Sequence, residues 1–298
     1  MENLNTSHIR STSLPSRLNP SNFSQIKINL NKLKTLAPFD SSARIHNGLV
    51  CLIELYVSVD HELIGSSHET QRFSLPCRNK ALLDDTLAVS TSLLDSYSNL
   101  VELLAQMKQN VRVLQFALRR KHVGTYASSE CHLNDYFSSR KIAKKNIFGC
   151  LGSLQQLERK IESYINVAGE DHHLSTAIGV LCEIFIATIS MFRYVLLILL
   201  GKQKLDKGFS FITKLIPMSK PSCHKSHEIV SDVDIVDVTL DTLWKDVKTN
   251  EWKTVDVEMA IERLQRLDRQ IEGYEVGLDT LFRKLIQSRV SLLNILAN

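Results

Sequence analysis

The side chains best suited to bind a charged partner gather in one short stretch of the chain. Arg140, Lys141, Lys144 and Lys145 occur at i, i+1, i+4 and i+5, which places these four cations along one side of a helix. Such a basic face is suited to an anionic lipid surface or an acidic protein. The alternative is an ordinary solvated helix face, which we favour because most charge runs have that role. Few aromatic residues lie among these cations, so we do not expect nucleic acid as a partner.

A second candidate site is a phosphorylation motif near the N-terminus. Arg10 lies three residues before Ser13, a spacing that suits a basophilic kinase, and Ser11 and Pro15 complete the pattern Arg-Ser-x-Ser-x-Pro. Once phosphorylated on Ser13, this pattern matches a ligand of the 14-3-3 proteins, whose arginines pair with phosphate. Short motifs of this kind also arise by chance in serine-rich segments, so an inert tail is the alternative that we favour.

The residues that could support metal binding or catalysis do not form a recognisable pattern. Cys223, His224 and His227 could supply metal ligands, and His172 and His173 two more. No cysteine pair at zinc-finger spacing accompanies them. No catalytic triad, nucleotide-binding loop or calcium loop stands out. We therefore expect no cofactor, no metal and no enzymatic activity.

Composition points to an intracellular protein. The 298 residues carry a formal net charge of +4, and the six cysteines are scattered without close pairs, unlike a secreted disulfide framework. We expect a cytoplasmic location. The first 39 residues contain nine Ser or Thr, five basic residues and one acid, which fits either a disordered tail, the reading we favour, or a plastid or mitochondrial transit peptide.

The elements that must position these residues are helices, and the clearest of them is the last. Six consecutive heptad positions near the C-terminus are apolar, and most positions three residues after them are apolar as well. This spacing predicts a helix over 254–296 with a coiled-coil-like seam. The seam positions are Val257, Leu264, Ile271, Leu278, Leu285 and Leu292. The seam could pack within the chain or pair two chains, so a homo-oligomer stays open.

Helical periodicity also predicts helices over 42–64, 79–121, 134–166 and 172–200, with a short one over 239–248. We expect an all-α, elongated helical bundle with long antiparallel, coiled-coil-like helices. Its parts would be a disordered tail over 1–41, a helical bundle over 42–201, a linker or loop over 202–238, and C-terminal helices over 239–298 that pack on the bundle.

Residues 177–200 are long and apolar enough to cross a bilayer. Glu183 and Arg193 interrupt them, and a charge near the bilayer centre costs roughly 2.5–3.5 kcal/mol on insertion scales. A buried bundle helix explains the same residues without that cost, so we favour it over a membrane span.

Several sequence blocks together resemble one plant-specific family, the Bypass-like proteins. HIRSTSLPSRLNP (residues 8–20) resembles the opening signature of that family, and GLVCLIELYVSVDHELI (48–64) is similar to its first helix. LLAQMKQNVRVLQFALRRK (103–121) and YFSSRKIAKK (136–145) resemble its central blocks, and LFRKLIQSRVSLLNIL (281–296) its C-terminal end.

The resemblance implies helical structure, no recognised catalytic activity and a role in root and shoot development. In Bypass itself this role is linked to restraining a mobile root-derived signal that arrests the shoot. We therefore expect a non-enzymatic regulator that binds other proteins. The alternative is a peripheral membrane or trafficking adaptor that uses the basic helix face.

Overall fold

The computed structural model describes residues 21–36, 42–70, 77–120, 126–165, 173–201, 231–249 and 253–297, and helices fill these ranges almost completely. The helices are α1 (Ser21–Leu36), α2 (Ser42–Thr70), α3 (Cys77–Arg120), α4 (Tyr126–Ile165), α5 (His173–Leu200), α7 (Asp232–Thr249) and α8 (Thr254–Ala297). The predicted all-α bundle is confirmed for the described residues, which contain no strand.

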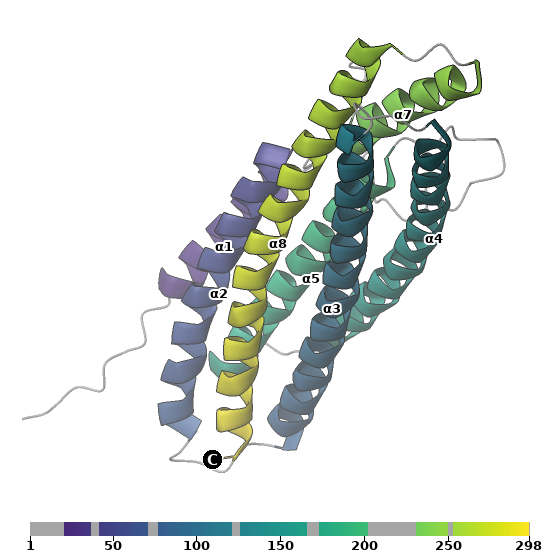
Figure 1. Ribbon diagram of the computed structural model, residues 1–298. Helices are drawn as coiled ribbons and strands as arrows, with labels where there is room; N and C mark the ends of the chain where they lie inside the picture. Colours follow the sequence, from purple (N-terminus) through teal and green to yellow (C-terminus); the bar gives the residue numbers. More distant parts are fainter. Residues whose placement is uncertain are drawn as a thin grey trace, which may run out of the picture.

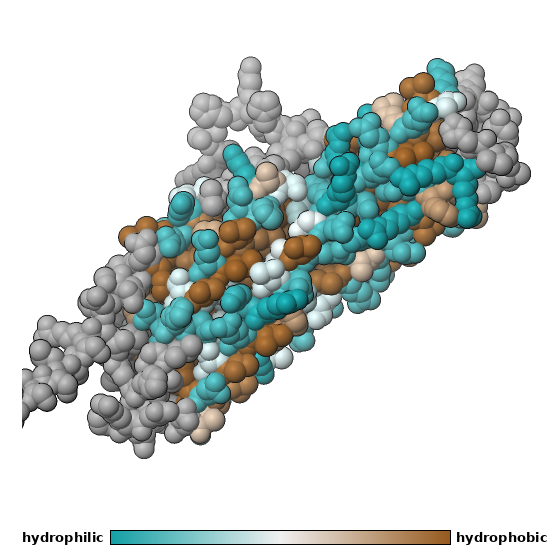
Figure 2. All heavy atoms as spheres, turned by 60° about the vertical axis from the view of Figure 1, so that its left-hand side comes forward, coloured by the Kyte–Doolittle hydropathy of each residue, from teal (hydrophilic) through white to brown (hydrophobic). Residues whose placement is uncertain are grey.

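The long helices lie side by side in an elongated bundle, with α8 between α2 and α3 (Figure 1). On the face seen in Figure 2, hydrophobic side chains are interspersed with hydrophilic ones along the length of the bundle. Helix α8 runs antiparallel to α3, since Arg112 of α3 pairs with Asp268 while Arg289 reaches the carbonyl of Leu87. Helices α2 and α8 instead run in the same direction, since Leu49 lies against Gly277 while Asp60 accepts from Gln287, which differs from the expectation of antiparallel neighbours.

The C-terminal seam is part of the bundle core. Every predicted seam position of α8 is buried, and so are the positions three residues after each. The seam faces α2 and α3, the two helices with the most extensive contacts to α8. Helix α2 packs tightly against Gly277, where a Cβ atom would lie 2.7 Å from Leu49 Cδ1. The predicted seam of α8 therefore packs against helices of the same chain.

Helix α5 contacts α1, α2, α3, α4 and α7, so other helices surround it. Among the described helices it is the one long and apolar enough to cross a membrane. Of its most apolar stretch, 61% is buried in the bundle. Both charges that interrupt it have partners on neighbouring helices. Arg193 Nη2 lies 2.6 Å from Glu158 Oε2 of α4, and Lys34 Nζ of α1 lies 3.2 Å from Glu183 Oε2. These contacts fit a core helix.

Two predicted segment boundaries are wrong. Residues 21–36, placed in the disordered tail, form α1, whose apolar side chains at helical spacing pack into the core with α2 and α5. These side chains are Phe23, Ile26, Leu30 and Leu33. The Asn, Lys, Ser, Thr and Gln residues between them make the segment mostly polar, which hides this stripe in the composition. The predicted linker over 202–238 is also wrong in its last part, because α7 begins at Asp232.

Candidate functional site

The four cations of the predicted basic face do not share one surface. Arg140 is buried with 6% of its surface exposed. Lys144 is half-buried, whereas Lys141 and Lys145 are exposed. The prediction of a four-residue basic face is therefore wrong for Arg140, which helix α7 covers. The exposed part is the pair Lys141 and Lys145, one helical turn apart.

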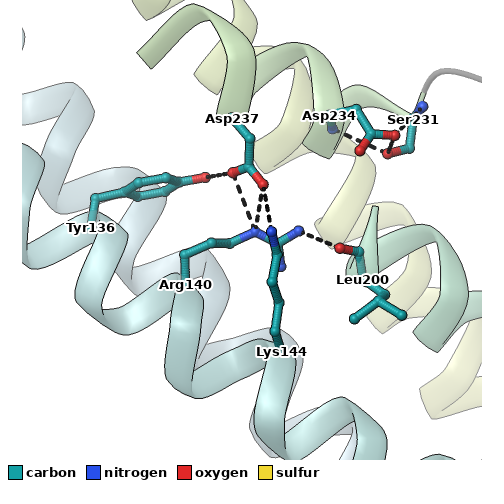
Figure 3. Close-up of polar contacts among 7 residues, drawn as sticks. All are labelled: Tyr136, Arg140, Lys144, Leu200, Ser231, Asp234 and Asp237. Atoms are coloured by element: carbon teal, nitrogen blue, oxygen red, sulfur yellow. Dashed lines mark hydrogen bonds and ion pairs between the residues drawn. The ribbon is translucent and has the colours of Figure 1, made fainter. Parts of the chain in front are cut away.

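Arg140 joins three helices through its guanidinium group (Figure 3). Its Nε donates to the Asp237 carboxylate of α7, at 3.0 Å to Oδ2 and 3.2 Å to Oδ1, and its Nη2 donates to the carbonyl of Leu200 at 2.8 Å. Leu200 ends α5, where the helix dipole presents negative charge. Arg140 thus binds the end of α5 to α7 and α4.

Asp237 accepts from two further residues of α4. Tyr136 Oη donates to Asp237 Oδ1 at 3.2 Å, and Lys144 Nζ donates to Oδ2 at 3.4 Å. Burial, followed by the negative charge of Asp237, raises the pKa of the Tyr136 phenol, so the hydroxyl stays protonated as a donor. Because one carboxylate receives all three donors, the arrangement cross-links helices rather than presenting an open binding site.

Next to this cluster lie Gly201 and Ser231, the described residues on either side of 202–230. Gly201 has φ of 73°, and a Cβ there would lie 2.5 Å from Asp234 Oδ1, so both the backbone and the close approach require glycine. Ser231 and Asp234 cap the start of α7 reciprocally: the Ser231 amide donates to Asp234 Oδ2 at 3.1 Å, and the Asp234 amide donates to Ser231 Oγ at 3.1 Å. Gly201 at the end of α5 and Ser231 before α7 therefore both lie beside Asp234.

Two of the candidate sites weighed from sequence lie outside the described residues: the motif containing Arg10, Ser11, Ser13 and Pro15, and the group of Cys223, His224 and His227. Within the described helices, no three His, Cys, Asp or Glu side chains are placed to hold a metal ion together.

The structure adds a feature that the sequence analysis missed, a groove between α3 and α4. It consists of two adjoining hollows of about 440 and 460 Å³ that share Gln109. Val113 and Phe116 of α3 line one hollow, and Ile142 of α4 lines the other. These three apolar side chains are 44%, 55% and 59% exposed.

A sequence signal for this groove exists on α3. Val111, Leu114 and Leu118 form the buried stripe, while Val113 and Phe116 lie three residues apart on the opposite side of the same helix. An apolar pair outside the core stripe is a feature that periodicity analysis can detect. That this pair belongs to a groove cannot be predicted from α3 alone, because Ile142 of α4 lines the other part of the groove.

The fold and these surfaces define the chain as an all-α helical bundle with shallow grooves between its long helices. The family described as Protein BPS1 matches residues 48–295, most of the chain, and the chain therefore belongs to this Bypass-like family. The resemblance read from the sequence is confirmed. No curated protein and no solved structure matches the chain.

Proposed function

We propose that this protein is a non-enzymatic, cytoplasmic regulator of plant root and shoot development that acts by binding other proteins. Its membership of the Bypass-like family supports the developmental role. The observation that carries the binding role is the α3–α4 groove. Val113 and Phe116 of α3 and Ile142 of α4 line this groove with their side chains exposed. Exposed apolar side chains in a groove are typical of surfaces that bind a protein partner.

A grafting experiment tests the developmental role. Plants that lack this protein should show shoot arrest, and a wild-type shoot grafted onto a mutant root should arrest as well. The reciprocal graft, a mutant shoot on a wild-type root, should grow normally and serves as the control. Normal growth of both grafts would contradict a role in restraining a root-derived signal.

A 14-3-3 protein is one partner that we propose, through Ser13 after phosphorylation. Arg10, Ser11 and Pro15 supply the rest of the recognised pattern. A peptide spanning residues 6–18 and phosphorylated on Ser13 should bind a 14-3-3 protein in a fluorescence-anisotropy titration, whereas the unmodified peptide should not. Equal binding of the two peptides would remove this partner.

The second candidate function is a peripheral membrane or trafficking adaptor. It is supported by Lys141 and Lys145, which are exposed one turn apart on α4, whereas Arg140 and Lys144 pair with Asp237. Basic residues near an anionic membrane contribute about 1 kcal/mol each.

Co-sedimentation with vesicles that contain phosphatidylserine tests this function. The double substitution Lys141→Glu and Lys145→Glu should abolish binding, and added salt should weaken it. The matched control is Arg266→Glu with Arg269→Glu, the same change of charge at exposed positions of α8. If both double variants lose binding equally, the α4 pair is not the membrane contact.

A further inference from the structure

The α3–α4 groove has a length and position that fit one bound helix. Its lining on α3 extends from Ala105 to Arg120, a rise of about 22 Å along that helix. Helix α4 contributes the opposite wall through His132, Ser139 and Ile142. A groove between two antiparallel helices accepts the ridge of a third helix, and a helix of about 16 residues would fill it.

The charges of the groove are unevenly placed along its length. Arg112, Arg120 and His132 line the hollow nearest the end of α3, and none of the described residues lining either hollow is acidic. Arg112 Nε already lies 2.8 Å from Asp268 Oδ1 of α8. Arg120 is exposed, and its guanidinium carbon lies 4.1 Å from the centre of the Phe116 ring. The cation of Arg120 therefore lies directly beside the most prominent apolar residue of this hollow.

We propose that the α3–α4 groove binds an amphipathic helix of a protein partner that carries acidic residues at the end nearest Arg120. The apolar side of this helix covers Phe116, Val113 and Ile142, and its carboxylates pair with the Arg120 guanidinium. A helix fits better than a lipid surface because the apolar residues lie in a concave groove. Lys141 and Lys145, the cations suited to lipid, are not among the residues that line it. This inference rests on the proposed function and names the chemistry of its partner.

Selection from a displayed library of helix-forming peptides of about 16 residues, with the full-length protein as bait, tests the proposal. The enriched peptides should combine apolar residues at helical spacing with Asp or Glu at one end. Phe116→Ser should weaken their binding roughly tenfold or more in fluorescence anisotropy, since a central aromatic anchor carries much of the binding energy. Arg120→Gln should reduce the preference for acidic over lysine-substituted peptides.

Val276→Ser is the control, because Val276 is an exposed apolar residue on α8, away from the groove. Peptide binding to this variant should be unchanged. Ile142→Ser provides a second groove variant, and the thermal midpoint of each variant shows whether the fold is retained. Enrichment of neutral or basic peptides, or equal binding to the Phe116 and Val276 variants, overturns the proposal.

Two other occupants of the α3–α4 groove would give different experimental results. If Phe116→Ser abolishes concentration-dependent dimerisation in analytical ultracentrifugation, the groove binds a second copy of this chain. If it abolishes binding to phosphatidylserine vesicles but not to peptides, the groove contacts lipid. Either result overturns the proposal. Peptide binding does not depend on plant growth, so its failure leaves the grafting test of the proposed function intact.

Discussion

At the scale of single residues, Arg140 is buried although its sequence surroundings are typical of an exposed helix face. Its neighbours Lys141, Lys144 and Lys145 give it the pattern of a solvated stripe. Its guanidinium nevertheless bonds to Asp237 and to the carbonyl of Leu200, residues 97 and 60 positions away in the chain. Because neither partner is local, no sequence window around Arg140 contains the reason for its burial.

Replacing Arg140 with Met should lower the free energy of unfolding by about 2–4 kcal/mol. The substitution keeps the apolar stem but leaves the Asp237 carboxylate and the Leu200 carbonyl without their main donor. Urea denaturation measures the loss. The exposed neighbour Lys141→Met is the control and should change stability by about 0.5 kcal/mol or less. Equal losses for the two variants would show that the Arg140 contacts do not stabilise the fold.

Tyr274 makes the stability of the protein depend on alkaline pH. Burial raises the pKa of this phenol from 10.0 to about 12. Between these values the unfolded chain ionises and the folded one does not, so its contribution is complete below pH 10 and is lost progressively as pH rises through 12. At pH 11 this should lower the free energy of unfolding by about 1.4 kcal/mol.

Denaturant titrations at pH 8 and pH 11 measure this effect. Tyr274→Phe removes the ionisable group, so the variant should lose less stability than the wild type over the same pH change. An identical loss in both proteins would mean that Tyr274 ionises as readily in the folded state as in the unfolded chain.

At the scale of elements, α8 follows its sequence pattern most closely. Its seam positions and the positions three residues after them recur every three or four residues, and the structure buries all of these positions. The pattern works because burying one face of a long helix requires only local periodicity and a neighbour to pack against. Helix α1 is the opposite case, since its stripe is too short to stand out within a polar segment.

Leu285→Ala should lower the free energy of unfolding by about 2–5 kcal/mol, since it removes a side chain that is 1% exposed and leaves a cavity. The adjacent Ile286 is 40% exposed, so Ile286→Ala should cost much less. Thermal unfolding followed by circular dichroism measures both. Equal midpoints for the two variants would contradict the placement of Leu285 in the core.

At the scale of the whole molecule, the C-terminal helices and the preceding bundle form one packed structure. Helix α7 contacts α4, α5 and α8, and α8 contacts α2 and α3. Trp244 of α7 is half-buried, with its ring centre 6.1 Å from that of Phe137 on α4. The division into a bundle over 42–201 and helices over 239–298 is therefore a division of the sequence and not of the core.

This shared core should unfold in a single transition. In a Trp252→Phe variant, Trp244 is the remaining tryptophan and reports on α7, while far-UV circular dichroism reports on all helices. The two signals should follow one urea denaturation curve, because α7 and the bundle lose the same contacts together. Two separated transitions would show that α7 and α8 unfold independently of α2–α5.

The all-α class, the approximate positions of the long helices and the buried face of α8 can be predicted from the sequence, because each follows from the local spacing of apolar residues. The family was also readable from short sequence blocks. The burial of Arg140 and the exposure of Lys141 and Lys145 required the folded structure, since a distant carboxylate and a helix end determine the surroundings of Arg140. The α3–α4 groove likewise required the structure, because it exists only where Phe116 and Ile142, from two different helices, lie along one surface.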